Sequence, residues 1–214
     1  MTRHEFLQRL HELLKPRIYL EVGVQHGWSL NLAKEATTAF GIDPHPLIQA
    51  TDNQVIFQET SDSFFDRAGH VIPPIDLAFI DGMHLFEYAL RDFINVDKHT
   101  HFKSVVVFDD VLPRNQQEAA RVQCPGDWTG DVWKVFYALR RTRPDLDLTL
   151  VNTQPTGVLV VTGLHRSPNN GISALEYQKV VTAFSAPYMD KVPDEVLNRD
   201  LAVEPDVALE RINT

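Results

Sequence analysis

The sequence is poor in cysteine and in long apolar runs, and both shortages limit what the protein can be. Cys124 is the single cysteine among 214 residues, so no disulfide can form within the chain. No apolar stretch approaches the roughly 20 residues that a membrane span needs. Acidic and basic residues interrupt the first 16 positions, unlike the core of a secretory leader. We therefore expect no membrane segment and a cytoplasmic location.

Basic side chains are also scarce. The formal net charge is −9, with 20 Lys and Arg residues against 29 Asp and Glu residues. Nucleic-acid binding depends on clustered Lys and Arg. The densest cluster, Arg140, Arg141 and Arg143, falls at the expected end of a helix, where cations stabilise the helix dipole. The composition therefore argues against a nucleic-acid partner.

The chain instead alternates short apolar runs with segments of helical periodicity. Strands are expected at residues 17–24, 38–44, 54–60, 75–81, 103–111, 146–153 and 157–163. Helices are expected at residues 6–14, 29–36, 84–99, 130–142 and 174–184, with a loop or short helix at 61–71. Strands that alternate with helices predict an α/β protein with a parallel, doubly wound sheet.

Two further features refine this prediction. The strands before the last two are continuous apolar runs, which is typical of a sheet with helices on both faces. The last two strands are joined by a connection too short for a crossover helix, so one of them should be antiparallel.

The regular alternation of expected strands and helices ends at residue 163. We expect an N-terminal helix in residues 1–16, the sheet domain in residues 17–162, and a C-terminal helix and tail in residues 163–214. The last 25 residues look like a loosely structured tail. Because this tail is polar and lies beyond the last strand, we expect residues 171–214 to serve oligomer contacts or closure of a pocket.

Acidic residues end four of the first five expected strands: Glu21, Asp43, Asp81 and the pair Asp109–Asp110. In doubly wound sheets, ligands bind at the carboxyl ends of the strands. Carboxylates gathered at one edge repel one another and are costly to desolvate, so a purely structural protein has little reason to place them there. The pattern indicates a ligand site at this edge.

The first strand runs into two glycines, Gly23 and Gly27, which permit a tight turn and a close approach of the backbone to a ligand. A dinucleotide fingerprint would need glycine at the positions of Gln25 and Trp28, and no Gly-Lys-Ser/Thr follows to make a phosphate-binding loop. Glu21, just before the turn, suits a ligand with a positive charge.

Asp43 ends the second strand, 22 residues after Glu21, which is the spacing at which an acid can bind ribose hydroxyls. Its alternative role is to start a turn before Pro44. Taken together, the two strand ends indicate a nucleoside ligand with a cationic part and no pyrophosphate.

The ordered set EVGVQHG, GIDP, IDLAFIDG and VVVFDDV, within residues 17–162, resembles the class I methyltransferases that use S-adenosylmethionine. The usual motif of that superfamily is E-x-G-x-G-x-G, and this chain departs from it at Gln25. Metal-dependent O-methyltransferases of the catechol type commonly share the departure. The resemblance implies a Rossmann-like sheet of seven strands in the order 3-2-1-4-5-7-6, with strand 7 antiparallel.

The resemblance also implies a cofactor site. Its candidate residues are Glu21, Gly23, Gly27, Ser29, Asp43, Ser61, Asp62 and Asp81. By this resemblance the two glycines line the methionine moiety, Asp43 holds the ribose, and Ser61 or Asp62 lies near the adenine. Glu21 supports the loop and adds negative potential near the sulfonium.

Asp81, Asp109 and Asp110 should converge, because the fourth and fifth strands are neighbours in that order. Three close carboxylates repel strongly unless a cation lies among them. Oxygen ligands suit Mg²⁺, with Mn²⁺ or Ca²⁺ as alternatives. The sugar O-methyltransferases of macrolide biosynthesis carry the same Asp, then Asp-Asp, at these positions. The alternative is that Asp109 caps a strand and Asp110 starts a turn.

Two further segments carry candidate functional residues. His84 follows Asp81 and could be a general base, a metal ligand or a polar cap, so Asp81 and His84 are the candidate catalytic residues. The long segment 113–131 is expected to be a lid or substrate wall, with Trp128 as an acceptor contact and Trp133 in the core. Residues 163–175 are also expected to line the pocket.

We therefore expect an S-adenosylmethionine-dependent methyltransferase that uses a divalent ion to methylate a hydroxyl of a small molecule or sugar. Three alternatives stay open: a cofactor-binding partner or sensor without transfer, a metal-independent enzyme with His84 as base, and a nitrogen or RNA-base acceptor. The negative charge and the three aspartates weigh against the last.

Overall fold

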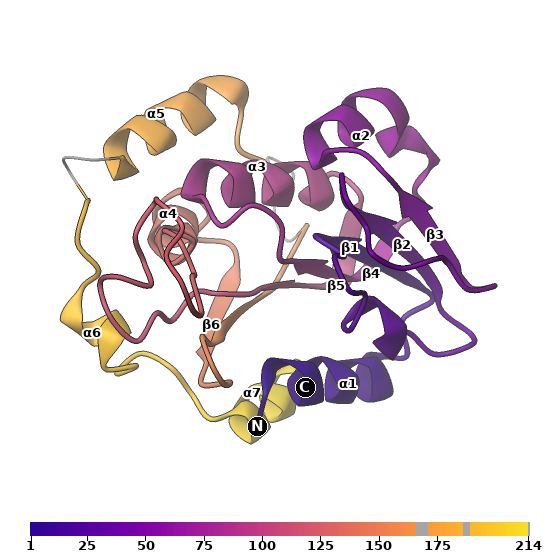
Figure 1. Cartoon of the computed structure of the whole chain (residues 1–214), viewed down its shortest axis with the longest axis horizontal. Coiled ribbons are helices and arrows are strands. Elements are labelled where there is room, and N and C mark those ends of the chain that lie inside the picture. The colour runs from indigo at the N-terminus through magenta and orange to yellow at the C-terminus, as the bar shows by residue number, and fades with distance from the viewer. Residues whose placement is uncertain (166–170, 186–188, 214) are drawn as a thin grey trace.

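A seven-stranded sheet in the order β3-β2-β1-β4-β5-β7-β6 forms the centre of the protein in the computed structural model (Figure 1). The structure describes residues 1–165, 171–185 and 189–213. The strands are β1 (Ile18–Val22), β2 (Thr38–Ile42), β3 (Gln54–Phe57), β4 (Ile75–Ile80), β5 (Thr100–Phe108), β6 (Asp147–Val151) and β7 (Val158–Thr162). The predicted strand order is confirmed.

Strand β7 is antiparallel to both of its neighbours, β5 and β6, and the other pairs are parallel, as predicted. The register places Val22 of β1 beside Ile80 of β4, and Ile80 beside Phe108 of β5. The residues that follow these three therefore come off the sheet in one row. This alignment brings the glycine loop and the aspartates to the same edge.

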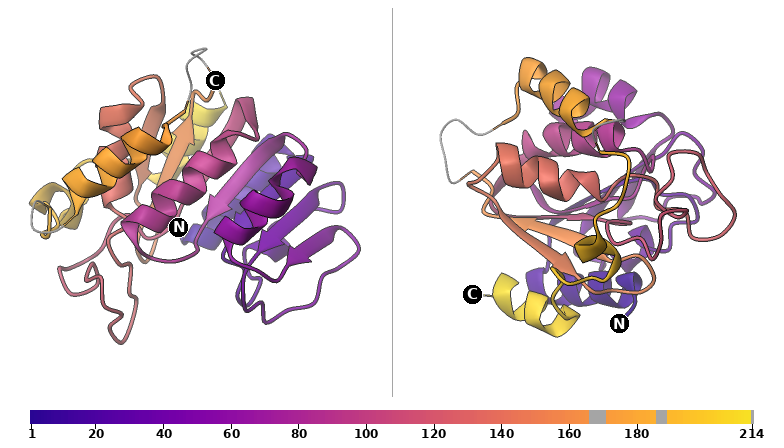
Figure 2. Two further views of the ribbon diagram at one scale, coloured as in Figure 1. Left: turned by 90° about the horizontal axis from the view of Figure 1, so that it is seen from above. Right: turned by 90° about the vertical axis from the view of Figure 1, so that its left-hand side faces the viewer.

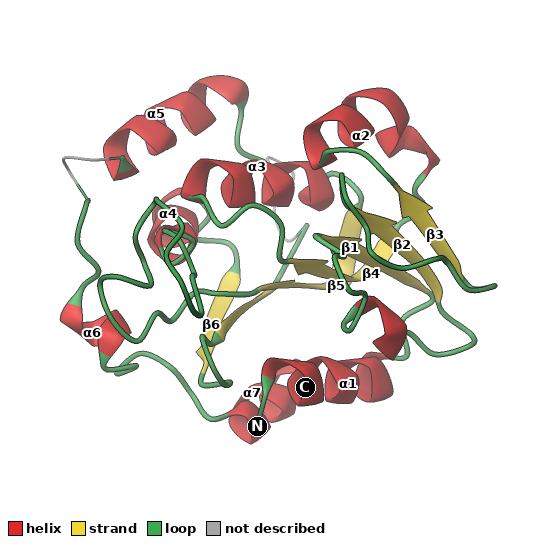
Figure 3. Cartoon of the chain, in the orientation of Figure 1, coloured by secondary structure: helices red, strands yellow, loops and turns green. Residues whose placement is uncertain are grey.

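Helices cover both faces of the sheet (Figure 3). They are α1 (Arg3–Leu14), α2 (Ser61–Ala68), α3 (Phe86–Asp97), α4 (Lys134–Thr142), α5 (Ala174–Phe184), α6 (Asp194–Leu197) and α7 (Pro205–Ile212), with 3-10 turns η1 (Leu30–Leu32) and η2 (Gly69–Val71). Helices α2 to α5 lie over one face, and α1 and α7 lie over the other (Figures 1 and 2). Each face has its own apolar core.

The helix expected at residues 29–36 is wrong, because only the single turn η1 forms there. The connection from β1 to β2 runs from residue 23 to residue 37, and the glycine loop takes its first part. A helix rises about 1.5 Å per residue against about 3.3 Å for extended chain, so the residues left are too few to return to a parallel strand as a helix. Helix α1 covers this part of the sheet instead, through Leu7 and Leu10.

The expectation of a loosely structured tail is also wrong for most of its length. The chain forms α6, pairs Val203 with Val151, and ends in α7. Pro205 stands at the first helical position of α7, where proline starts a helix rather than interrupting one. Ala208 and Leu209 are buried in the core that α1 shares, so the tail completes one face of the sheet.

None of the helices within the described parts of the chain combines the length and the apolar character needed to cross a membrane.

Candidate functional site

The glycine loop after β1 depends on protein contacts at both of its glycines. Gly23 has φ +91°, and a Cβ atom there would lie 1.9 Å from the carbonyl oxygen of Asp81. Gly27 has φ +69°, and its Cβ would lie 2.3 Å from Cδ1 of Ile48. Both positions lie in the left-handed region that favours glycine. The close packing therefore explains the glycines without a ligand.

Glu21 is fully buried beneath this loop and accepts two hydrogen bonds. The hydroxyl of Tyr19 donates to Oε2 at 2.6 Å, and the hydroxyl of Ser29 donates to Oε1 at 2.8 Å. Burial raises the pKa of Glu21 to about 8, although the two donors oppose the shift. Glu21 therefore fixes Ser29 at the start of η1, as the predicted supporting role requires, but much of its negative charge is lost at neutral pH.

Asp43 lies at the end of β2 and holds the glycine loop in place. Its Oδ2 accepts hydrogen bonds from the backbone N–H groups of Val24 and Gln25, both at 2.8 Å, and its Oδ1 accepts one from His45 at 2.6 Å. A carboxylate offers about four acceptor positions, so one remains for a ribose hydroxyl. The contact of Asp43 with a ribose stays a prediction. The hydrogen bond from His45 shows that Asp43 also starts the turn before Pro44, which was its alternative role.

Ser61 and Asp62 begin α2 and are tied to α3. Both oxygens of Asp62 accept from Arg91 at 2.5 Å, which makes a forked ion pair. Ser61 donates to Asp92, whose pKa burial raises to about 7. The contact of either residue with adenine stays a prediction.

Asp81, His84 and Asp110 form a group at the ends of β4 and β5. Each offers one ligand atom, and these atoms all lie within 4.8 Å of one another. His84 Nε2 lies 3.4 Å from Asp81 Oδ1, and His84 Nδ1 lies 3.2 Å from Asp110 Oδ2. Asp110 has φ +61°, an uncommon value for a residue other than glycine. Two carboxylates and an imidazole could together hold a divalent ion.

His84 also connects this group to the long loop 113–131. Its Nδ1 lies 2.7 Å from the carbonyl oxygen of Trp128, and the two rings stack with centroids 5.1 Å apart. Burial lowers the pKa of His84, but Asp81 and Asp110 outweigh it and raise the value to about 9. The backbone of Gly130 passes so close to His84 that a Cβ there would lie 1.6 Å from the His84 carbonyl oxygen. The loop therefore lies against the site, as expected of a lid or wall, and Trp133 is buried as predicted.

The structure separates Asp109 from the other two aspartates. Its carboxylate is buried, and Oδ2 accepts a hydrogen bond from Nη1 of Arg3 at 2.5 Å. The other oxygen, Oδ1, is buried with no hydrogen-bond partner among the described residues. Burial raises the pKa of Asp109 well above its usual range, Asp110 and Asp81 add to the rise, and Arg3 opposes it. Of the three predicted ligands, Asp81 and Asp110 come together, while Asp109 pairs with the N-terminal helix.

Sequence reasoning missed Arg3, Tyr19 and Trp28 as neighbours of this edge. Arg3 carried one signal, because a cation in the first turn of a helix opposes the helix dipole and needs another reason to be there. Trp28 is 64% exposed and stacks on His26, with ring centroids 5.1 Å apart. His26 is exposed as well, so both rings lie at the surface of the glycine loop.

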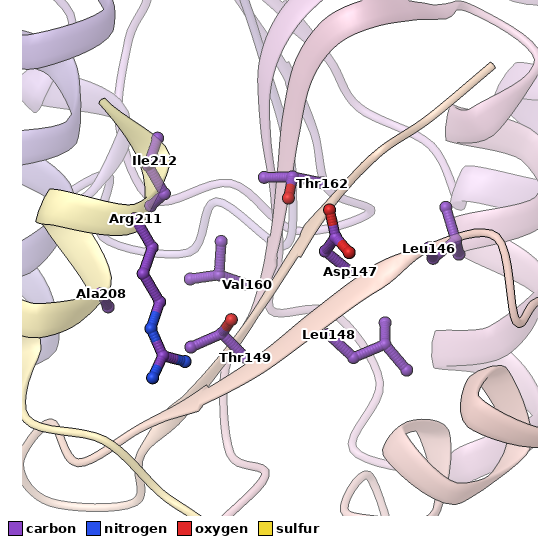
Figure 4. A pocket seen from close by; sticks show the side chains of 9 residues that line it. All are labelled: Leu146, Asp147, Leu148, Thr149, Val160, Thr162, Ala208, Arg211 and Ile212. Carbon is purple, nitrogen blue, oxygen red and sulfur yellow. The ribbon is translucent and has the colours of Figure 1, made fainter. Parts of the chain in front are cut away.

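A separate pocket of about 360 Å³ lies between the sheet and α7 (Figure 4). It is lined by Leu146, Asp147, Leu148, Thr149, Val160, Thr162, Ala208, Arg211 and Ile212. Its walls include the start of β6 and the end of β7, which lie at the edge of the sheet opposite the aspartates. The pocket is therefore distinct from the candidate site. Residues 166–170 of the predicted lining segment 163–175 lie outside the described residues.

Comparisons with known proteins agree with this geometry. Residues 20–111 match the family model of a methyltransferase domain. The fold is similar to the O-methyltransferase from Bacillus cereus in complex with SAH, at 16% identity and TM-score 0.56, covering 75% of this chain and 80% of that one. It is similar to the O-methyltransferase TomG from Streptomyces achromogenes, involved in tomaymycin synthesis and in complex with SAM, at 19% identity and TM-score 0.55, covering 75% and 78%.

A third similar structure is the SAH-bound methyltransferase PaMTH1 from Podospora anserina, at 14% identity and TM-score 0.57, covering 75% of this chain and 77% of that one. A search of curated protein sequences gave no match. The family-model match supports the resemblance to a methyltransferase domain over residues 20–111, and the solved structures share the fold. At these identities, the likeness to solved structures concerns the fold.

Proposed function

We propose that the protein is an S-adenosylmethionine-dependent O-methyltransferase that acts, with a divalent ion, on a hydroxyl of a small molecule or sugar. The observation that carries the proposal is the meeting of the glycine loop with Asp81, His84 and Asp110 at one edge of a methyltransferase fold. A cofactor bound at the loop and an acceptor bound at the acidic group would be adjacent, because Gly23 already touches the Asp81 backbone.

The cofactor would supply an electrophilic methyl group on a sulfonium. In this chain, the backbone of residues 23–27 would bind the methionine end, and Asp43 would offer its remaining acceptor position to the ribose. Ser29 is held by Glu21 and cannot at the same time donate its hydroxyl hydrogen to the cofactor. The fixed loop geometry would hold the methyl group in line with the acceptor oxygen.

The acidic group fits a divalent ion by its donor atoms. Asp81 and Asp110 offer carboxylate oxygens close together, and a ring nitrogen of His84 lies within 4.8 Å of both. Carboxylates suit Mg²⁺ and Mn²⁺, and an added imidazole ligand favours the transition metal. Such an ion would bind the acceptor hydroxyl and lower its pKa. Asp81 and Asp110 would orient that hydroxyl, and the Trp128 loop would exclude water.

A second candidate is transfer without a metal, with His84 as the base. It is favoured by the contacts of His84 with both Asp81 and Asp110. It is opposed by the pKa of about 9, because an imidazole protonated at neutral pH has no free nitrogen to accept a proton, whereas a bound divalent ion would displace that proton. A cofactor-binding partner without transfer would keep the loop but has no need of the acidic group.

Titration calorimetry with S-adenosylmethionine and with its demethylated product tests the first step. We expect binding of both, and we expect Asp43→Ala to weaken it by about tenfold or more, because the loop loses its anchor. Binding of NAD in place of both ligands would contradict the proposal. Methyl transfer after exhaustive chelation, with Mg²⁺ or Mn²⁺ added back, then separates the metal mechanism from His84 alone: full activity of the stripped protein would exclude the ion.

A further inference from the structure

Arg3 reaches the candidate site from a position fixed by the backbone. It is the first residue of α1, and Thr2 and Glu5 form a capping box around it. Its N–H donates to the carbonyl of Gln154 at 3.1 Å, and the N–H of Gln154 donates to Met1 at 3.0 Å. The connection between β6 and β7 thus holds the start of the chain on both sides of Arg3.

The side chain of Arg3 points at the acidic group. Nη1 donates to Asp109, and Asp81 and Asp110 are near enough to raise the pKa of Arg3 against the lowering effect of its burial. The side chain of Arg3 is 25% exposed and that of Asp109 is 1% exposed. A cation in the first turn of a helix opposes the helix dipole, so the placement needs a partner such as Asp109 to offset this cost.

We propose that Arg3 is a positioning residue of the site: it binds the Asp109 carboxylate and keeps it out of the ligand set, so that a divalent ion is held by Asp81, Asp110 and His84. The inference rests on the proposed function and deepens it. Asp109 then acts through its ion pair with Arg3, and the first turn of α1 becomes a wall of the acceptor site.

The charges of Arg3 and Asp109 predict different ion binding for a single and a double variant, according to whether Asp109 is a ligand. If Asp109 only compensates Arg3, then Asp109→Asn leaves an unpaired arginine near the ion, which repels it. The double variant Arg3→Gln/Asp109→Asn removes both charges, and the repulsion disappears. If Asp109 were a ligand, the single and double variants would lose the ion alike, because the missing oxygen is the same in both.

The first measurement is Mn²⁺ affinity at pH 8, by electron paramagnetic resonance of the free ion, without cofactor or acceptor. We expect Asp109→Asn to weaken binding by about tenfold, and the double variant to return to within about twofold of the wild type. Asp110→Asn, which removes a proposed ligand, should weaken binding by at least about 100-fold in either background. Arg9→Gln is the matched control, because Arg9 lies on the same helix and pairs with exposed Asp206.

The second measurement is methyl transfer, with kcat and KM separated. Arg3→Gln should lower kcat by about tenfold or more, Arg3→Lys should recover part of the loss, and Arg9→Gln should change neither constant by more than about twofold. If Arg3→Gln is too unstable to assay, the double variant carries the test, because it leaves no unpaired buried charge.

Several outcomes overturn the proposal. They are loss of Mn²⁺ binding in the double variant, an Asp109→Asn variant that binds as the wild type does, and an Arg3→Gln variant that matches Arg9→Gln throughout. Failure of the wild type to transfer a methyl group would overturn the proposed function instead, and the Mn²⁺ cycle would still decide the role of Arg3.

Discussion

At the carboxyl edge of the sheet, the carboxyl groups of two neighbouring regions have different kinds of partner. On the glycine-loop side, formed by residues 21–29 and Asp43, each carboxyl group has donors within the protein: Glu21 has two hydroxyls and Asp43 has three backbone N–H groups. On the acidic side, formed by Asp81, His84, Asp109 and Asp110, the carboxylates face one another and share one histidine and one arginine.

The difference shows which side is complete and which side needs another component. Polar groups that are buried and paired give a rigid loop that is ready to bind. Carboxylates that face one another raise each other's pKa: burial raises that of Asp110 to about 6, Asp81 adds to the rise, and His84 opposes it. A divalent cation would relieve this repulsion. In the proposed function, the glycine-loop side would hold the cofactor and the acidic side would act on the acceptor.

The largest effect should come from Asp110→Asn, which removes a charge from the acidic side alone. Asparagine tolerates the positive φ of this position, so the backbone need not change. We expect methyl transfer to fall by at least about 100-fold while affinity for the demethylated cofactor changes less than about threefold. Calorimetry and a transfer assay measure the two quantities. Asp206→Asn, in the exposed ion pair with Arg9, is the control. Equal loss of both quantities would show that the two sides are not separable.

The next effect concerns the rigidity of the glycine-loop side. Gly23→Ala would press a Cβ against the Asp81 backbone, so we expect a loss of about 3 kcal/mol or more in the free energy of unfolding. Gly27→Ala meets the end of the Ile48 side chain and should lose about 2 kcal/mol, part of which Ile48→Ala restores. Urea unfolding measures each.

Gly126→Ala provides the control for this series. Gly126 also has a positive φ, +100°, but among the described residues other than its two chain neighbours, no heavy atom lies within 4 Å of the position of its Cβ. Only backbone strain of about 1 kcal/mol should remain there. If the three alanine variants lose the same amount, contact with the rest of the protein is not what demands glycine in the loop.

The sequence could predict where the glycine loop and Asp43 lie in the fold because the information for their position is local. Strand pattern, the two glycines and the acids at strand ends all lie within short segments, and parallel register then aligns them. The meeting of Asp81 with Asp110 followed from the expected strand order for the same reason. His84 was found because it stands three residues after Asp81.

The remaining features depend on contacts between distant segments. Arg3 and Asp109 are separated by 106 positions, and no periodicity links them. The helix expected at residues 29–36 had helical composition, but its connection was too short, which is a tertiary constraint. The tail was expected to be loosely structured because α7 buries only one face. The few apolar residues of that face are a weak signal in a helix as short as Pro205–Ile212.

The smallest effect tests whether Glu21 is held neutral on the glycine-loop side. Its folded pKa of about 8 lies above the ordinary value, so the folded state binds a proton that the unfolded state releases above about pH 4.5. The stabilising contribution of Glu21 should therefore be fully present below that pH and be lost as pH rises toward 8, by about 1 kcal/mol per pH unit. Glu21→Gln keeps the shape of the side chain without its titration, so its stability should fall less steeply with pH than that of the wild type.

Urea unfolding between pH 5 and pH 8 measures the slope for the wild type, Glu21→Gln and the control Glu176→Gln. Glu176 is exposed, and the hydroxyl and backbone of Ser173 lower its pKa, so its titration lies below this window and its variant should follow the wild type. A wild type with the same slope as Glu21→Gln would mean that Tyr19 and Ser29 keep Glu21 ionised. The loop would then carry a full negative charge beside a sulfonium, and cofactor affinity would gain an electrostatic contribution that falls with added salt.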